Sequence, residues 1–312
     1  MLQRIIRPHD HIRTILPTSA VSERLVLNAG DYGLAVQERA ELIMLPDIAG
    51  YVGADTCGCL LAIRQDQQEE ISLMIDIGTN GEMVLGNRER MVTCSTAAGP
   101  AFEGAKIECG MRGAAGAVDH VKYEDGKWNY TTVGNKPAVG LCGSGLIDLV
   151  AGLLDAGMLD ENGVLRSGQE KQGVFILVLP ERGGNERGVY LTQKDLGEVQ
   201  LAKAAIAAGI QMLMERLGIT EDDICSVYIA GAFGNYMDPV SAGKIGLLPA
   251  TLVKKVKPVG NAAGEGAKIA LVNEKEMLEM DELVRKIEFV ELAASADFQD
   301  HFIDELGFET GE

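Results

Sequence analysis

Four glycine-rich segments constrain this chain more than any other feature, because each of them follows a short apolar stretch. They span residues 76–82, 139–145, 230–234 and 259–266. An apolar run of this kind, bounded by glycine, is typical of a buried strand. Glycine lets backbone N–H groups approach an anion closely, and a helix that begins at such a loop adds partial positive charge. One such loop also suits an ordinary turn, but four in one chain, with an acidic residue at a strand end, indicate a ligand that carries phosphate.

The order of the remaining patterns predicts an α/β fold in which a mixed sheet is flanked by helices. Residues 71–77 are predicted to form a buried strand that enters an Asn-Gly turn at 78–81, and two more strands complete a meander. The two further strands of the meander are predicted at 82–85 and 91–94, and other strands at 42–44, 174–179, 225–230, 255–259 and 287–291. A hairpin is predicted at 121–132, and helices at 146–154, 193–217, 239–245, 276–286 and after 266. Thr192 and Asp195 form the pattern of a capping box at the start of the longest helix.

Charge and composition exclude several classes of function. The 28 Lys and Arg residues are outnumbered by 46 Asp and Glu residues, which gives a net charge of −18. Such an acidic chain is unsuited to nucleic acid, whose phosphates demand a basic face, and it repels anionic lipid headgroups. No apolar stretch is long enough to predict a membrane span, and residues 1–17 lack the apolar core of a secretory signal. The scattered cysteines fit reduced thiols, so we expect a cytoplasmic protein.

Asp76 is the strongest candidate for a functional carboxylate, because it ends an apolar strand and precedes a Gly-Thr-Asn-Gly turn. Such an aspartate can hold Mg²⁺ through water while the turn faces phosphates; the alternative is that it only hydrogen-bonds the turn. Asp148, in a helix that starts near Gly145, is a candidate for a second metal-binding or water-orienting carboxylate; the alternative is a charge that the helix macrodipole favours. Glu103, in another glycine-rich stretch, is a candidate to position a water.

Other chemical motifs are weaker or absent in the sequence. The Gly-Lys pair at 243–244 is followed by Ile245 rather than Ser or Thr, so it is no Walker A loop. The glycines of 143–145 lack the third glycine of the dinucleotide-binding fingerprint. Residues 57–59, Cys-Gly-Cys, could supply two metal ligands, but without further ligands nearby we favour two small core residues at the start of a helix.

Several longer motifs carry a family resemblance. They are DIGTNGE at 76–82, STAAGPAFEG at 95–104, GLCGSGLID at 140–148 and YIAGAFGN at 228–235. Together they resemble the C-terminal domain of the reductive activators of corrinoid proteins. The resemblance implies the ribonuclease-H-like fold of actin, heat-shock chaperone ATPases, and acetate and sugar kinases. On that basis we expect a ribonuclease-H-like nucleotide-binding domain at 45–292, a lead-in at 1–44 left from a preceding domain, and an acidic tail at 293–312.

The resemblance also implies which residues contact the nucleotide. Of the three candidate catalytic residues, Asp76, Asp148 and Glu103, the resemblance places Asp76 in the phosphate-binding hairpin and Asp148 in a connecting helix between subdomains. The phosphate-binding turn corresponds to Gly78, Thr79, Asn80 and Gly81, the adenosine-binding loop to Gly231, Ala232, Phe233 and Gly234, and the start of a connecting helix to Gly143, Ser144 and Gly145.

Members of this family use ATP to drive the reduction of a corrinoid protein from Co(II) to Co(I). The resemblance therefore implies ATP and Mg²⁺ as cofactors and a corrinoid protein as partner, with a homodimer also possible. We expect this chain to be the C-terminal, nucleotide-binding and partner-docking part; the alternative is a partner-binding module without ATP turnover. A small-molecule kinase is less favoured, because the sequence has no readable sugar- or acyl-binding signature. The cysteines of the family's N-terminal 2Fe–2S domain and its first phosphate hairpin are absent, so we expect no iron–sulfur cluster in this chain.

Overall fold

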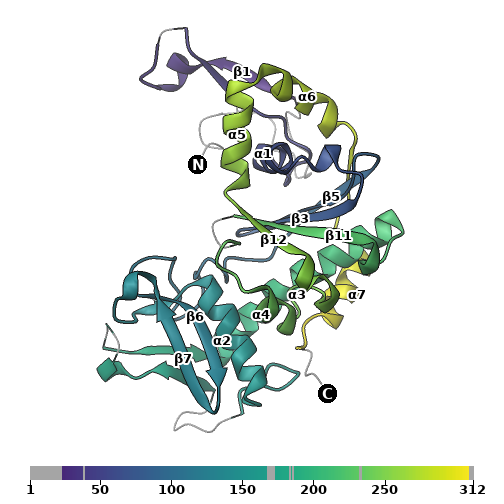
Figure 1. Ribbon diagram of the computed structural model, residues 1–312. Coiled ribbons are helices and arrows are strands. Elements are labelled where there is room, and N and C mark those ends of the chain that lie inside the picture. The colour runs from purple at the N-terminus through teal and green to yellow at the C-terminus, as the bar shows by residue number, and fades with distance from the viewer. Residues whose placement is uncertain are drawn as a thin grey trace.

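The computed structural model describes residues 23–308, apart from 38, 167–172, 183, 185, 232 and 233. A six-stranded sheet lies at its centre, with the strand order β12-β11-β3-β4-β5-β13 (Figure 1). The strands are β3 (Ile71–Ile77), β4 (Gly81–Gly86), β5 (Met91–Thr96), β11 (Ile224–Ala230), β12 (Val256–Gly260) and β13 (Ile287–Phe289). The first three form the predicted antiparallel meander, whereas β11, β12 and β13 each run parallel to the strand beside them. The prediction of a mixed sheet is confirmed.

Helices cover both faces of this sheet because apolar side chains alternate along its central strands. Leu73 and Ile75 join a core that includes Ile206 of α3, whereas Met74 joins a second core with Leu60 of α1. One layer contains α1 (Ala54–Ile63), α5 (Ala262–Val272) and α6 (Glu274–Val284), and the other contains α3 (Gln193–Leu217) and α7 (Ala296–Asp304). The central strands are buried on both sides, as expected for a sheet between helical layers.

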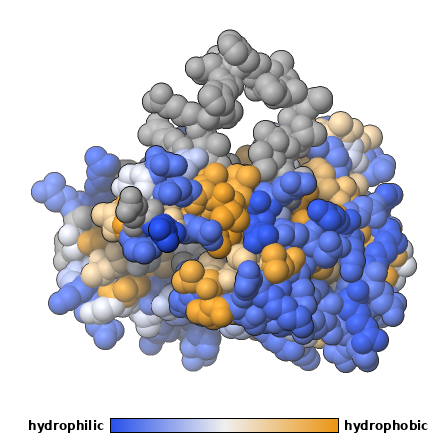
Figure 2. All heavy atoms as spheres, turned by 90° about the horizontal axis from the view of Figure 1, so that it is seen from above, coloured by the Kyte–Doolittle hydropathy of each residue, from blue (hydrophilic) through white to orange (hydrophobic). Residues whose placement is uncertain are grey.

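The layer of α1, α5 and α6 also carries a short antiparallel hairpin. It consists of β1 (Leu25–Asn28) and β2 (Glu41–Met44). Arg24 ties this hairpin to α6 through an ion pair with Asp281 at 3.2 Å. Seen from this side, the molecule is mostly hydrophilic, with apolar side chains gathered near the middle (Figure 2).

A second lobe is inserted between β5 and α3. It contains a three-stranded sheet of β6 (Ala117–Glu124), β7 (Lys127–Thr132) and β8 (Gly140–Leu141), together with α2 (Gly143–Asp155), β9 (Val174–Val178) and β10 (Val189–Thr192). The hairpin of β6 and β7 turns at Asp125 and Gly126, as predicted, and both have positive φ. Trp128 packs between Tyr123 and Phe175, with ring centroids 4.8 and 4.9 Å away. This small aromatic core holds the lobe together.

Side-chain caps mark the starts of α3 and α4 (Pro239–Lys244). α3 begins with the predicted capping box, in which Thr192 and Asp195 each accept a hydrogen bond from the other's backbone N–H. α4 begins at Asp238, whose carboxylate accepts from two backbone N–H groups. The segment expected as an acidic tail includes α7, which packs on α3, and Phe308 beyond it is only 3% exposed.

None of the helices in the part of the chain that the structure describes has the length and apolar character needed to cross a membrane.

Candidate functional site

The carboxyl ends of three parallel strands lie side by side in the central sheet. In the register of the sheet, Ala230 at the end of β11 stands beside Asp76 of β3 on one side and Gly260 of β12 on the other. Three of the four glycine-rich segments begin at this edge, although they are far apart in the sequence. Open α/β sheets bind their ligands at the carboxyl ends of the strands. We therefore place the candidate functional site here.

A tight turn between β3 and β4 forms one wall of the site. The Gly78 N–H donates to the Asn80 carbonyl at 2.9 Å, and Gly81 begins β4 opposite Ile77. The Thr79 hydroxyl donates to Oε1 of Glu103 at 2.8 Å. The structure thus brings Glu103 to the predicted phosphate-binding turn, where it contacts the side chain of Thr79. This contact suits a residue that holds the turn in place.

Asp76 lies beneath the start of α1. Its Oδ2 accepts a long hydrogen bond from the Cys59 thiol at 3.8 Å. Burial, followed by the charge of Asp55 in the first turn of α1, raises the pKa of Asp76. A side chain at Gly231 would come within 3.0 Å of Asp76 Oδ1, so the glycine, at φ +91°, leaves this carboxylate its space. Cys59 and Cys57 are both fully buried in α1, in agreement with the interpretation of 57–59 as core residues.

Glu82 is a further acidic residue of the site that the sequence analysis does not single out. It stands directly opposite Asp76 in the β3–β4 ladder, and its Oε1 accepts from the Ser95 hydroxyl at 3.1 Å. Burial is the main reason that its pKa rises to about 7, and the charges of Asp55 and Asp76 add to the effect. Like charges directly opposite in a sheet are destabilising. The hairpin register offers a signal for this residue, because the turn at 78–80 places residue 82 across from residue 76.

The ligand chemistry of this edge fits a hard cation that keeps some of its water. Carboxylate oxygens are the protein ligands that Mg²⁺ prefers, and Mg²⁺ usually takes its other ligands from water and phosphate. Within the described part of the chain, no three His, Cys, Asp or Glu side chains converge closely enough to hold a metal by themselves. Asp76 with Glu82 therefore suits a metal that arrives together with phosphate oxygens.

The loop that is expected to bind adenosine, residues 231–234, is described only in part. Ala232 and Phe233 lie outside the described residues. The Gly234 N–H donates to the Gly231 carbonyl at 3.2 Å, and a side chain at Gly234 would come within 2.8 Å of the Ile229 carbonyl. Both glycines thus permit a tight return of the backbone at the end of β11.

The fourth glycine-rich segment serves a different purpose. A Cβ at Gly145 would lie 2.2 Å from the Val118 carbonyl, so this glycine lets α2 pack closely on β6. The neighbouring Ser144 hydroxyl donates to the Asp119 carbonyl at 2.8 Å, and Gly143 is buried as well. These contacts give Ser144 and Gly145 a packing role, and the binding role expected of residues 143–145 stays a prediction.

The described hydrogen bonds of Asp148 are with residues of β6 and α4, and none of them reaches the turn at 78–81. It is 5% exposed, and its Oδ2 accepts from His120 Nδ1 at 3.0 Å and from the Val121 N–H at 3.3 Å. Burial raises its pKa, whereas hydrogen bonds from Ser241 and His120 act in the opposite direction. Asp148 lines a cavity of about 740 Å³ between the β6–β7 hairpin, α2 and α4. The structure places Asp76 at the sheet edge, Glu103 at the turn beside it and Asp148 in the wall of this cavity, and the catalytic role of Asp148 stays a prediction.

A mixed sheet with glycine turns at its carboxyl edge, an acidic residue ending the central strand and helices on both faces defines a nucleotide-binding class of α/β protein. The family model described as "C-terminal domain of RACo the ASKHA domain" matches residues 70–312, and the one described as "RACo middle region" matches residues 8–68. The chain belongs to the RACo family. The predicted family and the predicted actin-type fold are confirmed.

Individual relatives agree with this assignment. "Corrinoid activation enzyme RamQ" of Eubacterium limosum is 36% identical over 296 residues, which cover 90% of this chain and 50% of that protein. The Co(II) methylated amine-specific corrinoid protein reductase of Methanosarcina barkeri is 29% identical over 303 residues, 89% of this chain and 54% of that protein. Among solved structures, a reductive activator for corrinoid, iron-sulfur protein superposes with a TM-score of 0.87 at 38% identity, covering 93% of this chain and 48% of that one. The chain spans about half the length of these relatives.

Proposed function

We propose that this chain is the nucleotide-binding and partner-docking part of an activator in which ATP drives the one-electron reduction of a corrinoid protein from Co(II) to Co(I). The electron would come from a separate redox centre, such as the family's 2Fe–2S domain. The names of the relatives support the reaction and the corrinoid protein partner. The observation that carries the nucleotide part is the alignment of Asp76, Ala230 and Gly260 at one sheet edge. A cytoplasmic location fits reduced cysteines, and a homodimer stays a prediction.

Each residue at the edge has a separate task in this proposal. The backbone of 78–81 would face the phosphates, with Thr79 restrained by Glu103. Asp76 would hold Mg²⁺ through water, and Gly231 would leave room beside it. Bound Mg·ATP would supply the free energy of phosphoryl transfer to drive the proposed reduction. Asp148 is not included here, because its described contacts belong to the cavity at α2.

Calorimetric titration with Mg·ATP and Mg·ADP tests the proposal, first with the chain unchanged and then with Asp76→Ala. We expect micromolar binding, weakened at least about tenfold by the substitution, which corresponds to about 1.4 kcal/mol. Asp222→Ala is the control, since Asp222 is an exposed aspartate in a short 3-10 helix. Absence of heat at millimolar nucleotide with the unchanged chain would contradict the nucleotide part.

A second measurement distinguishes the activator from the alternative, a partner-binding module without ATP turnover. Phosphate release that depends on Asp76 supports the activator, whereas binding without any phosphate release favours the module.

A further inference from the structure

Lys203 is the largest fully buried side chain that carries a charge among the described residues, at 2% exposure in the middle of α3. Lysine is almost never fully buried unless its ammonium is paired. The Lys203 ammonium donates to the Gly307 carbonyl, lies 4.0 Å from a Glu305 carboxylate oxygen and sits 5.5 Å from the centre of the Phe308 ring. Its partners in these contacts all follow α7. The C-terminal residues therefore cover a buried charge.

Residues 296–308, which we name the C-terminal strap, lie along α3 over most of its length. Gln200 donates to the Leu306 carbonyl at 2.9 Å, and Gln211 donates to Glu305 at 3.3 Å. Near the C-terminal end of α3, His301 contacts Glu215 at 2.9 Å. The strap thus contacts α3 on both sides of Lys203.

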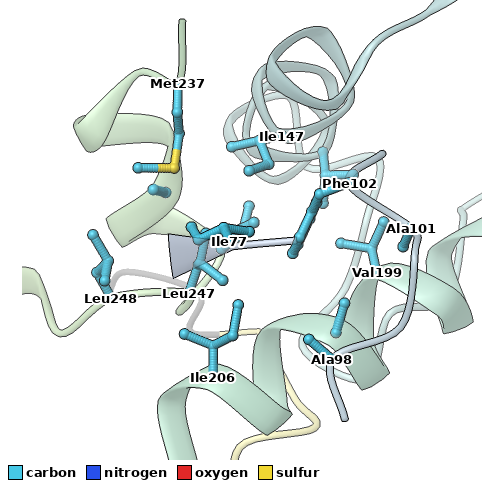
Figure 3. Packing of buried hydrophobic residues seen from close by; sticks show 14 of the residues in the cluster. Ile77, Ala98, Ala101, Phe102, Ile147, Val199, Ile206, Met237, Leu247 and Leu248 are labelled. Carbon is cyan, nitrogen blue, oxygen red and sulfur yellow. The ribbon is translucent and has the colours of Figure 1, made fainter. Parts of the chain in front are cut away.

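From Lys203 the contacts continue to the turn of the proposed nucleotide site. Ile206 lies one helical turn further along α3, and its side chain is 3.2 Å from the position that a Cβ at Gly81 would occupy. Ile206, Ile77 and Leu247 pack together under the end of β3 (Figure 3). Gly246 approaches the Lys203 ammonium so closely that a Cβ would lie 3.0 Å from it. Lys203, in α3, therefore contacts both the strap and the loop after α4. Ile206 of α3 and Leu247 of that loop pack under the turn at 78–81.

We infer that the C-terminal strap controls the position of the turn at 78–81 through Lys203 and α3, so that release of the strap weakens nucleotide binding. When the strap leaves, the ammonium becomes accessible to water, and α3 loses the contacts that press it against β4. The effect on nucleotide rests on the proposed function, whereas the mechanical link between strap and turn does not.

The test uses the full chain with Lys203→Met, which keeps the length of the side chain and removes its charge. Hydrogen exchange is followed in peptides that cover the strap and the turn, and nucleotide affinity by calorimetry. We expect exchange to rise about tenfold in the strap and also to rise at 78–81, with a Kd for Mg·ADP about fivefold higher. Lys275→Met is the matched control, because the Lys275 side chain is 82% exposed on α6.

Phe308→Ala provides a second variant if Lys203→Met fails to fold, since it keeps the ammonium and removes only the ring that covers it. The inference is overturned if the strap exchanges faster in either folded variant while exchange at 78–81 and the Kd stay unchanged. It is also overturned if exchange in the strap does not change. If the unchanged chain binds no nucleotide, the proposed function fails, and a joint rise of exchange in strap and turn still supports the mechanical link.

Discussion

The individual residues that matter most in this protein are carboxylates that face one another at the sheet edge. Asp76 and Glu82 stand opposite each other in the ladder, and Asp55 adds a third negative charge nearby. Burial raises the pKa of both strand residues, which means that the folded protein disfavours their charged forms. Such arrangements reduce stability and concentrate at functional sites. A cation at this edge would relieve the repulsion.

Glu82 makes stability depend on pH in a defined direction. Its pKa is 4.5 in the ordinary state and about 7 in the folded chain, so between these values the folded state holds a proton that the unfolded state has lost. The free energy of unfolding should therefore fall as pH rises through this range, by at most about 3 kcal/mol. Glu82→Gln should flatten this slope and be more stable than the unchanged chain at about pH 8. Urea unfolding at several pH values measures both effects.

Glu89→Gln is the control for this experiment, because Glu89 is exposed in the loop between β4 and β5. An unchanged pH slope in Glu82→Gln would show that the buried carboxylate is not the origin of the dependence.

Among the secondary-structure elements, α1 and α5 cross unusually closely. A Cβ at Gly266 would lie 1.9 Å from the Gly58 carbonyl, and one at Gly58 would lie 2.8 Å from the Ala263 carbonyl. Gly266 is the last residue of 259–266, one of the four glycine-rich segments that together indicate a ligand carrying phosphate. It lies inside α5, and its missing side chain is explained by helix packing. The end of that segment is therefore a packing feature.

Gly266→Ala tests this explanation. The backbone of α1 cannot give way as a flexible side chain can, so we expect a loss of about 1–3 kcal/mol in the free energy of unfolding. Gly197→Ala is the matched control, because Gly197 is also helical and has nothing within 4 Å of its Cβ position. That substitution should stabilise the protein by up to about 1 kcal/mol through helix propensity alone. Chemical denaturation of both variants measures the free energy of unfolding. A Gly266→Ala protein as stable as Gly197→Ala would exclude the close crossing of α1 and α5.

At the scale of the whole molecule, the acidic balance is the dominant property. A net charge of −18 on a folded chain of 312 residues produces repulsion between its own surface groups. Ion pairs such as those of Glu288 with Arg90 and Arg216 offset the repulsion locally. The excess of carboxylates remains, and it should make the folded state sensitive to ionic strength.

We therefore expect the Tm to rise by a few degrees when sodium chloride increases from about 0.02 M to about 0.5 M, because salt screens repulsion between exposed charges. The increase should shrink near pH 4.7, where the net charge approaches zero. Differential scanning calorimetry at both pH values measures it. A Tm that falls with salt at neutral pH would mean that the ion pairs contribute more than the repulsion costs.

The local features of this protein follow from residues that lie near one another in the chain. The Asn-Gly turn after β3, the capping box at Thr192 and the hairpin at Asp125 were all predictable, because turn chemistry, capping and periodicity depend on residues close together in the chain. The long motifs also sufficed to predict the family and its fold, and the position of Asp76 at a strand end.

Which distant residues meet depends on how the whole chain folds. Glu82 faces Asp76 because of the ladder register, and Asp148 meets His120 because α2 packs on β6. Lys203 contacts Gly307, which lies 104 positions later in the chain. Local patterns carry no information about such encounters, since the free energy of burying these groups depends on the contacts that the folded chain supplies. The acidic C-terminal segment, expected as a tail, contains α7, whose partly buried Phe298 and Phe302 pack against the core beside α3.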